Sequence, residues 1–80
     1  MPQRNHHTMK EVVLSREPVE LYKILKFEGL LASGGEAKFA VADGLVKVNG
    51  VVELQKRKKI VSGDVIEFDG QAFKVKLAAL

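Results

Sequence analysis

The sequence predicts a single α+β domain in which a two-helix hairpin packs on a small antiparallel β-sheet. Two observations lead to this fold class. Apolar residues recur at helical spacing between Pro18 and Gly44, and short apolar runs then alternate with Asn-Gly and Asp-Gly turns. Helices followed by strands within 80 residues leave room for one helical layer on one sheet.

The first ten residues are polar and are expected to form a flexible tail, so that the domain spans residues 11–80. No stretch has the length and apolarity of a signal peptide or a membrane span. Whether Met1–Thr8 belong to the natural protein is left open. Val12-Val13-Leu14 predict a short buried strand.

The first helix is predicted to begin at Pro18, because proline suits the first helical position, where its missing N–H costs nothing. Leu21, Ile24 and Leu25 follow at the spacing of one apolar stripe. Gly29 suits the left-handed conformation that ends many helices. The helix is therefore expected to pack one face on the core and to end near Gly29.

The second helix is predicted to begin after Ser33, because Ser33 and Glu36 have the spacing of a capping box. In that motif the Ser33 hydroxyl accepts from the Glu36 amide, and the Glu36 carboxylate accepts from the Ser33 amide. Gly44 is expected to end this helix. The inward stripe consists of Ala37, Ala40 and Val41.

The remaining chain predicts four strands. Asn49-Gly50 and Asp69-Gly70 each separate two apolar runs, and such pairs favour type I′ turns, which need positive φ at both central residues. The predicted strands cover residues 45–48, 51–54, 65–68 and 73–77.

Four consecutive cations, Lys56-Arg57-Lys58-Lys59, here called the basic run, are the most conspicuous charge feature. The whole chain has 13 bases and 10 acids, a net charge of +3, whereas residues 46–60 contain five bases and one acid. A small core does not bury such charges, so they are expected to point outward. They favour contacts with phosphates, or they protect an exposed strand edge; both interpretations stay open.

Three further features are interpreted as structural when each is taken alone. Lys38, near the start of the second helix beside two glycines, is expected to be a solvated residue of an ordinary capped helix. Phe27 and Phe39 lie off the apolar stripes and could stack nucleic-acid bases. In so short a chain they are expected instead to close the far side of the core.

Several chemistries are not expected. The chain has no cysteine, which excludes disulfides and thiolate sites and favours a reducing, cytoplasmic location. His6 and His7 are adjacent residues of the tail and make a poor preformed metal site. The serines have no histidine partner outside the tail, so no hydrolase triad, cofactor or enzymatic activity is predicted.

The order of these motifs resembles the RNA-binding domain named after ribosomal protein S-four, and especially its small stand-alone bacterial members of the YbcJ type. The resemblance covers residues 19–70. It rests on Leu21 and Leu25, residues 33–38 (SGGEAK), residues 42–50 (ADGLVKVNG), the basic run and residues 62–66 (SGDVI).

The resemblance implies an αL motif, in which the two helices and the following hairpin form one RNA-facing surface. Position by position, that surface would contain Ser33, Lys38, Lys47, Asn49, Lys56, Arg57, Lys58 and Lys59. Two motifs depart from the family pattern. Many members have Thr-Arg-Ser where this chain has Ser33-Gly34-Gly35, and Arg-Leu-Asp where it has Glu20-Leu21-Tyr22. Both departures remove positive charge from the helical part of the surface.

The sequence thus predicts a monomeric, non-catalytic protein that binds structured RNA, such as ribosomal RNA, through phosphate contacts. Ribosomal or RNA-processing proteins are possible partners, and a membrane is not expected. The alternative is a protein-interaction adaptor, for example a ribosome-associated one, built on a partly degenerate RNA-binding scaffold. An apolar patch on the helices would favour this alternative.

Overall fold

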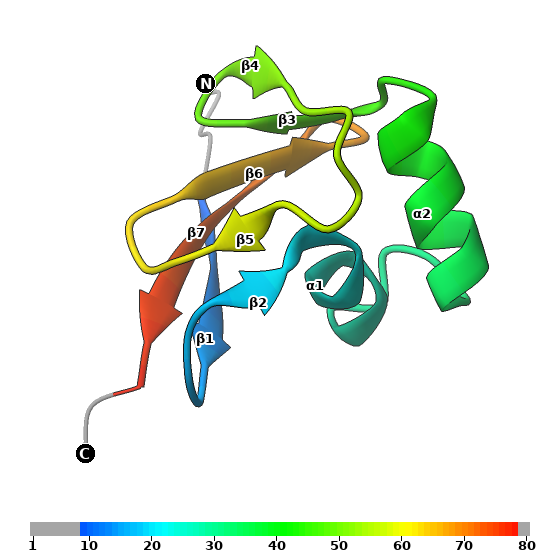
Figure 1. Ribbon diagram of the computed structural model, residues 1–80. Helices are drawn as coiled ribbons and strands as arrows, with labels where there is room; N and C mark the ends of the chain where they lie inside the picture. The colour runs from blue at the N-terminus through cyan, green and yellow to red at the C-terminus, as the bar shows by residue number, and fades with distance from the viewer. Residues whose placement is uncertain (1–8, 79–80) are drawn as a thin grey trace, which may run out of the picture.

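The computed structural model describes residues 9–78 and confirms the α+β class. The first elements are β1 (Lys10–Leu14), β2 (Val19–Glu20), α1 (Leu21–Phe27) and α2 (Gly34–Ala42). Five strands follow, β3 (Val46–Val48), β4 (Val51–Val52), β5 (Lys59–Ile60), β6 (Val65–Phe68) and β7 (Gln71–Leu77). Figure 1 shows α1 and α2 beside each other, with β2 leading directly into α1. The expected tail lies outside the described residues up to Thr8, and Lys10 already belongs to β1.

The strands form two sheets rather than the single antiparallel sheet that was expected. A five-stranded sheet has the order β1-β7-β6-β3-β4, and β2 pairs with β5 in a separate two-stranded sheet. The larger sheet is mixed, because β1 runs parallel to β7 with Val12 opposite Val75. This parallel pair can form because the whole domain separates the two strands along the chain, which gives the connection that parallel pairing requires.

Strand β1 is buried on one side only. Val12 and Leu14 are buried, whereas Val13 is 61% exposed. Three apolar residues in a row therefore do not mark a fully buried strand here, because successive side chains point to opposite faces and one face of this sheet is open.

Helix α1 begins at Leu21, not at Pro18. Val19 and Glu20 pair with Ile60 and Lys59, so these two residues are extended and the helix starts after them. The predicted stripe of Leu21, Ile24 and Leu25 is confirmed as buried.

Both helices end as predicted, in Schellman motifs. At the end of α1, Gly29 has φ +74° and the Leu30 N–H donates to the Leu25 carbonyl oxygen at 3.1 Å. At the end of α2, Gly44 has φ +79° and the Leu45 N–H donates to the Ala40 carbonyl oxygen at 3.1 Å.

One hydrophobic core joins the helices to the sheets. Its residues come from both helices, from β5 and from one face of the five-stranded sheet. Among residues 9–78, no polar or charged side chain is buried. No helix of the described chain is long and apolar enough to cross a membrane. Any site in residues 9–78 that uses charged side chains must therefore lie on the surface.

Candidate nucleic-acid interface

The basic run spans the end of the connection between β4 and β5 and the first residue of β5, with all four side chains exposed. Lys56 and Arg57 form a turn that the Lys58 N–H closes by donating to the Gln55 carbonyl oxygen at 3.0 Å. Lys59 begins β5, and the next residue, Ile60, is fully buried. The core thus anchors one end of the basic run while its charges face solvent, as expected.

The main chain of the basic run is bound to the start of α1. The Leu21 N–H donates to the Lys58 carbonyl oxygen at 2.9 Å, and the Tyr22 N–H donates to the Lys56 carbonyl oxygen at 3.1 Å. The first N–H groups of a helix have no partner within the helix, and Glu20 provides no side-chain cap. The carbonyls of the basic run fill that role, so its position relative to α1 is fixed.

Tyr22 joins the basic run to both helices. The Lys38 ammonium lies 4.7 Å from the centroid of the Tyr22 ring, and the Arg57 guanidinium carbon lies 5.5 Å from it. Both distances are within the range of cation–π attraction. We call Tyr22, Lys38 and Arg57 the tyrosine cluster. In it, one cation from α2 and one from the basic run lie against the ring of a residue of α1. Lys38 is therefore half-buried and engaged rather than freely solvated.

Glu20 holds the Arg57 side chain from the other direction. Arg57 Nη1 donates to Glu20 Oε1 at 3.3 Å and to Oε2 at 3.4 Å, and Lys23 Nζ lies 3.6 Å from Oε1. Partial desolvation alone would raise the pKa of the Glu20 carboxyl. The hydrogen bond from Arg57 and the positive charges of Arg57 and Lys23 outweigh it, so that the pKa lies below its usual value.

Ser33 and Glu36 cap α2 in a modified form of the predicted box. The Glu36 N–H donates to Ser33 Oγ at 3.1 Å, as predicted. The Glu36 carboxylate accepts from the amide of Ala32 at 3.1 Å, not from that of Ser33. Ser33 is exposed, and its hydroxyl hydrogen stays available to a ligand.

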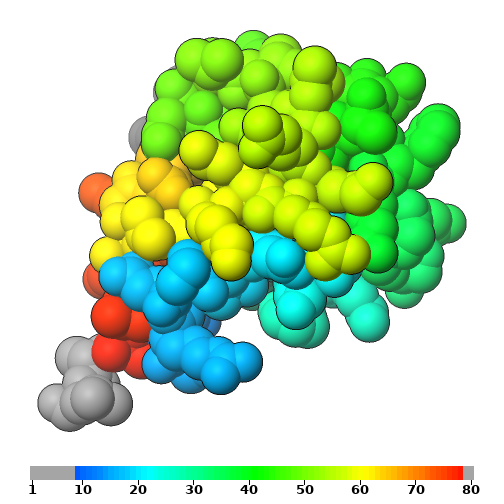
Figure 2. Space-filling model, in the orientation of Figure 1, coloured from blue at the N-terminus to red at the C-terminus, as the bar shows by residue number. Residues whose placement is uncertain are grey.

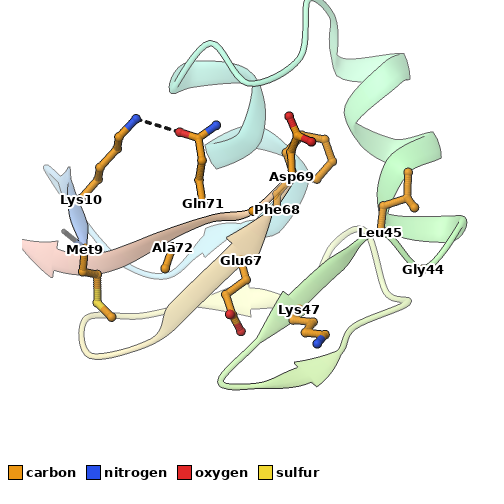
Figure 3. A pocket seen from close by; sticks show the side chains of 11 residues that line it. Met9, Lys10, Gly44, Leu45, Lys47, Glu67, Phe68, Asp69, Gln71 and Ala72 are labelled. Carbon is orange, nitrogen blue, oxygen red and sulfur yellow. Dashed lines mark hydrogen bonds between the residues drawn. The ribbon is translucent and has the colours of Figure 1, made fainter. Parts of the chain in front are cut away.

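The structure places Lys47 away from the tyrosine cluster. Lys47 alternates along β3 with Val46 and Val48, which are both buried, so its side chain points to the open face of the sheet. Figure 3 shows Lys47 and Glu67 on one side of the sheet and Lys10 and Gln71 on the other.

The cavity that these side chains help to line, about 470 Å³ in volume, does not gather ionisable groups around one point. The polar contact across it is a hydrogen bond of 2.7 Å from Lys10 Nζ to Gln71 Oε1. In the described chain, no three His, Cys, Asp or Glu residues are grouped as metal ligands would be. His6 and His7 lie outside the described residues.

Asn49 has a structural role that its sequence position did not reveal. Its Nδ2 donates to Asp64 Oδ1 at 3.1 Å, and its Oδ1 accepts from the Val65 N–H at 2.9 Å. Its own N–H donates to the Val65 carbonyl oxygen at 2.7 Å. The side chain thus connects the β3–β4 turn to the turn before β6, and its acceptor and one donor hydrogen are already used.

The sequence did not indicate that Glu20 and Tyr22 contact the cations of the candidate interface, and the expectation for two phenylalanines was wrong. Phe27 is 68% exposed and Phe39 is 70% exposed, so neither closes the core. The edge position of Tyr22 on the α1 stripe was the available signal for that residue. The contacts of Glu20 and Tyr22 with Arg57 depend on the pairing of β2 with β5, which joins residues 39 and 41 positions apart and has no sequence signature.

Known proteins share both this fold and this sequence pattern. YbcJ of Escherichia coli K12 and YbcJ of Shigella flexneri are each 49% identical to the chain over 63 residues, which cover 78% of the chain and 90% of each relative. The solution structure of E. coli YbcJ, with an αL motif involved in RNA-binding, matches at a TM-score of 0.67 and 43% identity. That match covers 95% of this chain and 99% of YbcJ.

A part of a larger ribosomal protein is also similar. The 30S ribosomal protein S4e of Thermoplasma acidophilum matches at a TM-score of 0.63 and 32% identity, over 74% of this chain and 31% of S4e. The model of the S4 domain family matches residues 12–76. That range contains α1, α2, the basic run and the paired strands that hold them together, and the chain accordingly belongs to the S4 domain family.

Proposed function

We propose that this protein binds structured RNA through its phosphates, using the tyrosine cluster and the basic run, without catalysing a reaction. The observation that carries the proposal is the anchoring of Lys38 and Arg57 on the Tyr22 ring. Ordered cations of a fixed spacing lose less conformational entropy when they meet phosphates than free lysines do. Membership of the S4 domain family supports the proposal, as does the αL motif involved in RNA-binding in E. coli YbcJ.

Ribosomal RNA is the proposed target class, because the similar region of S4e belongs to a ribosomal protein. Folded RNA presents phosphates at several separated positions, which two helices and a loop can contact together. Proteins recognise such RNA by its shape more than by its sequence. A cytoplasmic location and a monomeric state are part of the same proposal. Both suit a small basic protein that meets RNA directly.

A salt titration of RNA affinity tests the proposed surface. A folded RNA hairpin is titrated with the protein at several salt concentrations, and the slope of log affinity against log salt is measured. The double variant Lys56→Ala/Lys58→Ala removes two charges from the basic run. Each lost phosphate contact should flatten the slope by about 0.7–0.9.

The matched control is Lys47→Ala/Lys74→Ala, which removes the same charge from the open face of the sheet, where both side chains are exposed. For the control, the slope of log affinity against log salt should stay close to that of the wild type. Equal losses in both variants would mean that net charge, not this surface, attracts RNA.

Tyr22→Leu should also weaken RNA binding, because Lys38 and Arg57 lose the ring that holds them. Tyr22→Phe keeps an aromatic ring at this position and should retain RNA binding.

A second candidate function, a protein-interaction adaptor, has one observation in its favour. An apolar groove of about 450 Å³ lies beside α2, lined by Leu31, Phe39, Leu45 and Phe68 among others. Exposed apolar surface of this kind is common at protein interfaces. Partners that remain bound after nuclease treatment, and that are lost with Phe39→Ser, would support the adaptor. Loss of all partners with nuclease would exclude it.

A further inference from the structure

A second cavity lies next to the basic run, on the side of β2 and the connection from β1. Its volume is about 690 Å³, within the range of pockets that hold small ligands, about 300–1,000 Å³. Figure 2 shows the yellow-green and yellow side chains around the basic run directly beside the blue and cyan ones of residues 15–24. Its charged and aromatic lining comes from Arg16, Glu20, Lys23, Phe27, Arg57 and Lys59.

The cavity has an excess of positive charge. It is lined by four cations and one carboxylate, and that carboxylate, Glu20, already contacts Arg57 and Lys23. Within residues 9–78, Arg16 and Lys59 have no acidic side chain within 4.0 Å. Two cations thus remain available to an anionic ligand at the cavity, and Arg57 belongs both to it and to the tyrosine cluster.

Phe27 gives the same cavity an aromatic wall. It is 68% exposed although it lies at the end of a helix whose aliphatic residues, Leu21, Ile24 and Leu25, are fully buried or nearly so. It follows Lys23 by four residues, so both side chains lie on one face of α1, one turn apart. Phe27 thus shares a cavity with two cations that are unpaired within residues 9–78, Arg16 and Lys59. Proteins hold single-stranded nucleic acid with such a combination, in which a base stacks on the ring and the backbone contacts the cations.

We propose that this cavity binds an unpaired nucleotide of the RNA, with its base stacked on Phe27 and its phosphates near Arg16 and Lys59. The inference rests on the proposed RNA binding and extends it. The tyrosine cluster, Lys56 and Lys58 contact the phosphates of the folded part of the RNA, and the cavity, with Lys59, receives a flanking single-stranded segment. The preferred target is therefore a junction between a helix and an unpaired strand, not an uninterrupted duplex.

Two RNAs that differ only in their bases test this inference. One is a hairpin with a short single-stranded extension, and the other carries an abasic extension of the same length, so that the number of phosphates is equal. The wild-type protein should bind the RNA with bases more tightly, by about 5- to 150-fold for a stacked base. Phe27→Ala should abolish this preference while it leaves the affinity for the abasic RNA unchanged.

Phe39→Ala is the matched control. Phe39 is also an exposed ring on a helix, at 70%, but it lies in the apolar groove, which no cation lines. This variant should keep the wild-type preference. A loss of preference in Phe39→Ala as large as in Phe27→Ala, or an unchanged preference in Phe27→Ala, would overturn the assignment to this cavity.

A fluorescence signal gives a second, independent readout. The chain has no tryptophan, so Phe27→Trp introduces a single reporter at the cavity. Its emission should be quenched by the RNA with bases and not by the abasic RNA, and Phe39→Trp should respond to neither. If the wild-type protein binds both RNAs equally and Lys56→Ala/Lys58→Ala still weakens binding, only the cavity is wrong. If it binds neither RNA, the proposed function fails as well.

Discussion

The carbonyl oxygen of Lys58 accepts a hydrogen bond of 2.9 Å from the N–H of Leu21, the first residue of α1. A residue of the basic run therefore completes the end of a helix that lies 37 positions earlier in the chain. This hydrogen bond involves only main-chain atoms, so the Lys58 side chain is free for a ligand while its backbone stabilises the helix. The main-chain carbonyl of Lys58 thus has a structural role that leaves its exposed ammonium group unused.

Hydrogen exchange should detect this arrangement. The amides of Leu21 and Tyr22, which donate to Lys58 and Lys56, should exchange slowly although they belong to the first turn of α1. The amide of Lys23, which does not donate to the basic run, should exchange faster. The measurement is amide exchange followed by NMR. Exchange of Leu21 and Tyr22 as fast as that of Lys23 would show that the basic run is not attached to α1 in solution.

Glu20 should make the stability depend on pH in the acidic range. Its pKa in the folded protein lies below the usual value of 4.5, because Arg57 and Lys23 stabilise the charged carboxylate. A lowered pKa adds stability above the pKa of the unfolded chain, and this contribution is lost as the pH falls through the folded-state pKa. Wild type should therefore exceed Glu20→Gln in free energy of unfolding at pH 7, and the difference should shrink below about pH 4.5.

Urea denaturation of both proteins at pH 7 and at pH 3.5 measures the difference. The carboxylate is accessible to solvent, so the effect should be small and should weaken further in high salt. A difference that grows as the pH falls would contradict the assigned sign.

Asn49 should matter for stability more than for direct RNA contact. Asn49→Ala removes the side-chain hydrogen bonds to Asp64 and Val65. It also places alanine, which disfavours positive φ, at a backbone φ of +54°. Two hydrogen bonds and the left-handed conformation together predict a loss of about 2–4 kcal/mol in the free energy of unfolding. Asn49→Gly loses the same hydrogen bonds without the backbone strain, so it should be about 1 kcal/mol more stable than Asn49→Ala.

Chemical denaturation gives these free energies, and RNA affinity is measured at a temperature where both variants are folded. Affinity close to that of wild type is expected for Asn49→Gly. A strong loss of affinity in the folded glycine variant would instead make the Asn49 side chain a direct RNA contact.

The sequence predicted features that depend on neighbouring residues and missed features that depend on contacts between residues far apart in the chain. The Asn49-Gly50 and Asp69-Gly70 turns were correct, with positive φ at all four residues. Both turns are decided within a few residues, as are the helix ends at Gly29 and Gly44. The start of α1 was wrong because it depends on the distant pairing of residues 19–20 with 59–60, a pairing only two residues long.

The interface was predicted as a set of charges but not as an arrangement. The eight residues expected from the family resemblance include Lys38 and Arg57, which the structure does bring together. Composition could not show that Tyr22 contacts both cations, since the Lys38 contact depends on how α1 packs against α2 and the Arg57 contact depends on how β2 pairs with β5. The exposure of Phe27 was not predicted either, because helical periodicity says which face is inside but not what covers the other face.

Gly34 offers a way to strengthen the helical part of the interface. It is the first residue of α2, and it stands where the family pattern that the sequence resembles has arginine. A Cβ added at Gly34 would lie 3.7 Å from Tyr22 Cε2, an ordinary van der Waals contact, so the Cβ itself does not displace the tyrosine cluster. Gly34→Arg should therefore add a cation beside Lys38 and Arg57.

If that cation meets a phosphate, RNA affinity should rise and the salt slope should steepen by about 0.7–0.9. Gly34→Ala is the control, because it also removes a flexible glycine but adds no charge. Removing the glycine should raise the free energy of unfolding by up to about 1 kcal/mol in either variant. Both variants should thus be more stable than wild type, and only the arginine variant should bind more tightly. Equal affinities for the two variants would mean that RNA does not reach the start of α2, and the interface would then be confined to the basic run and the face of Tyr22 next to Arg57.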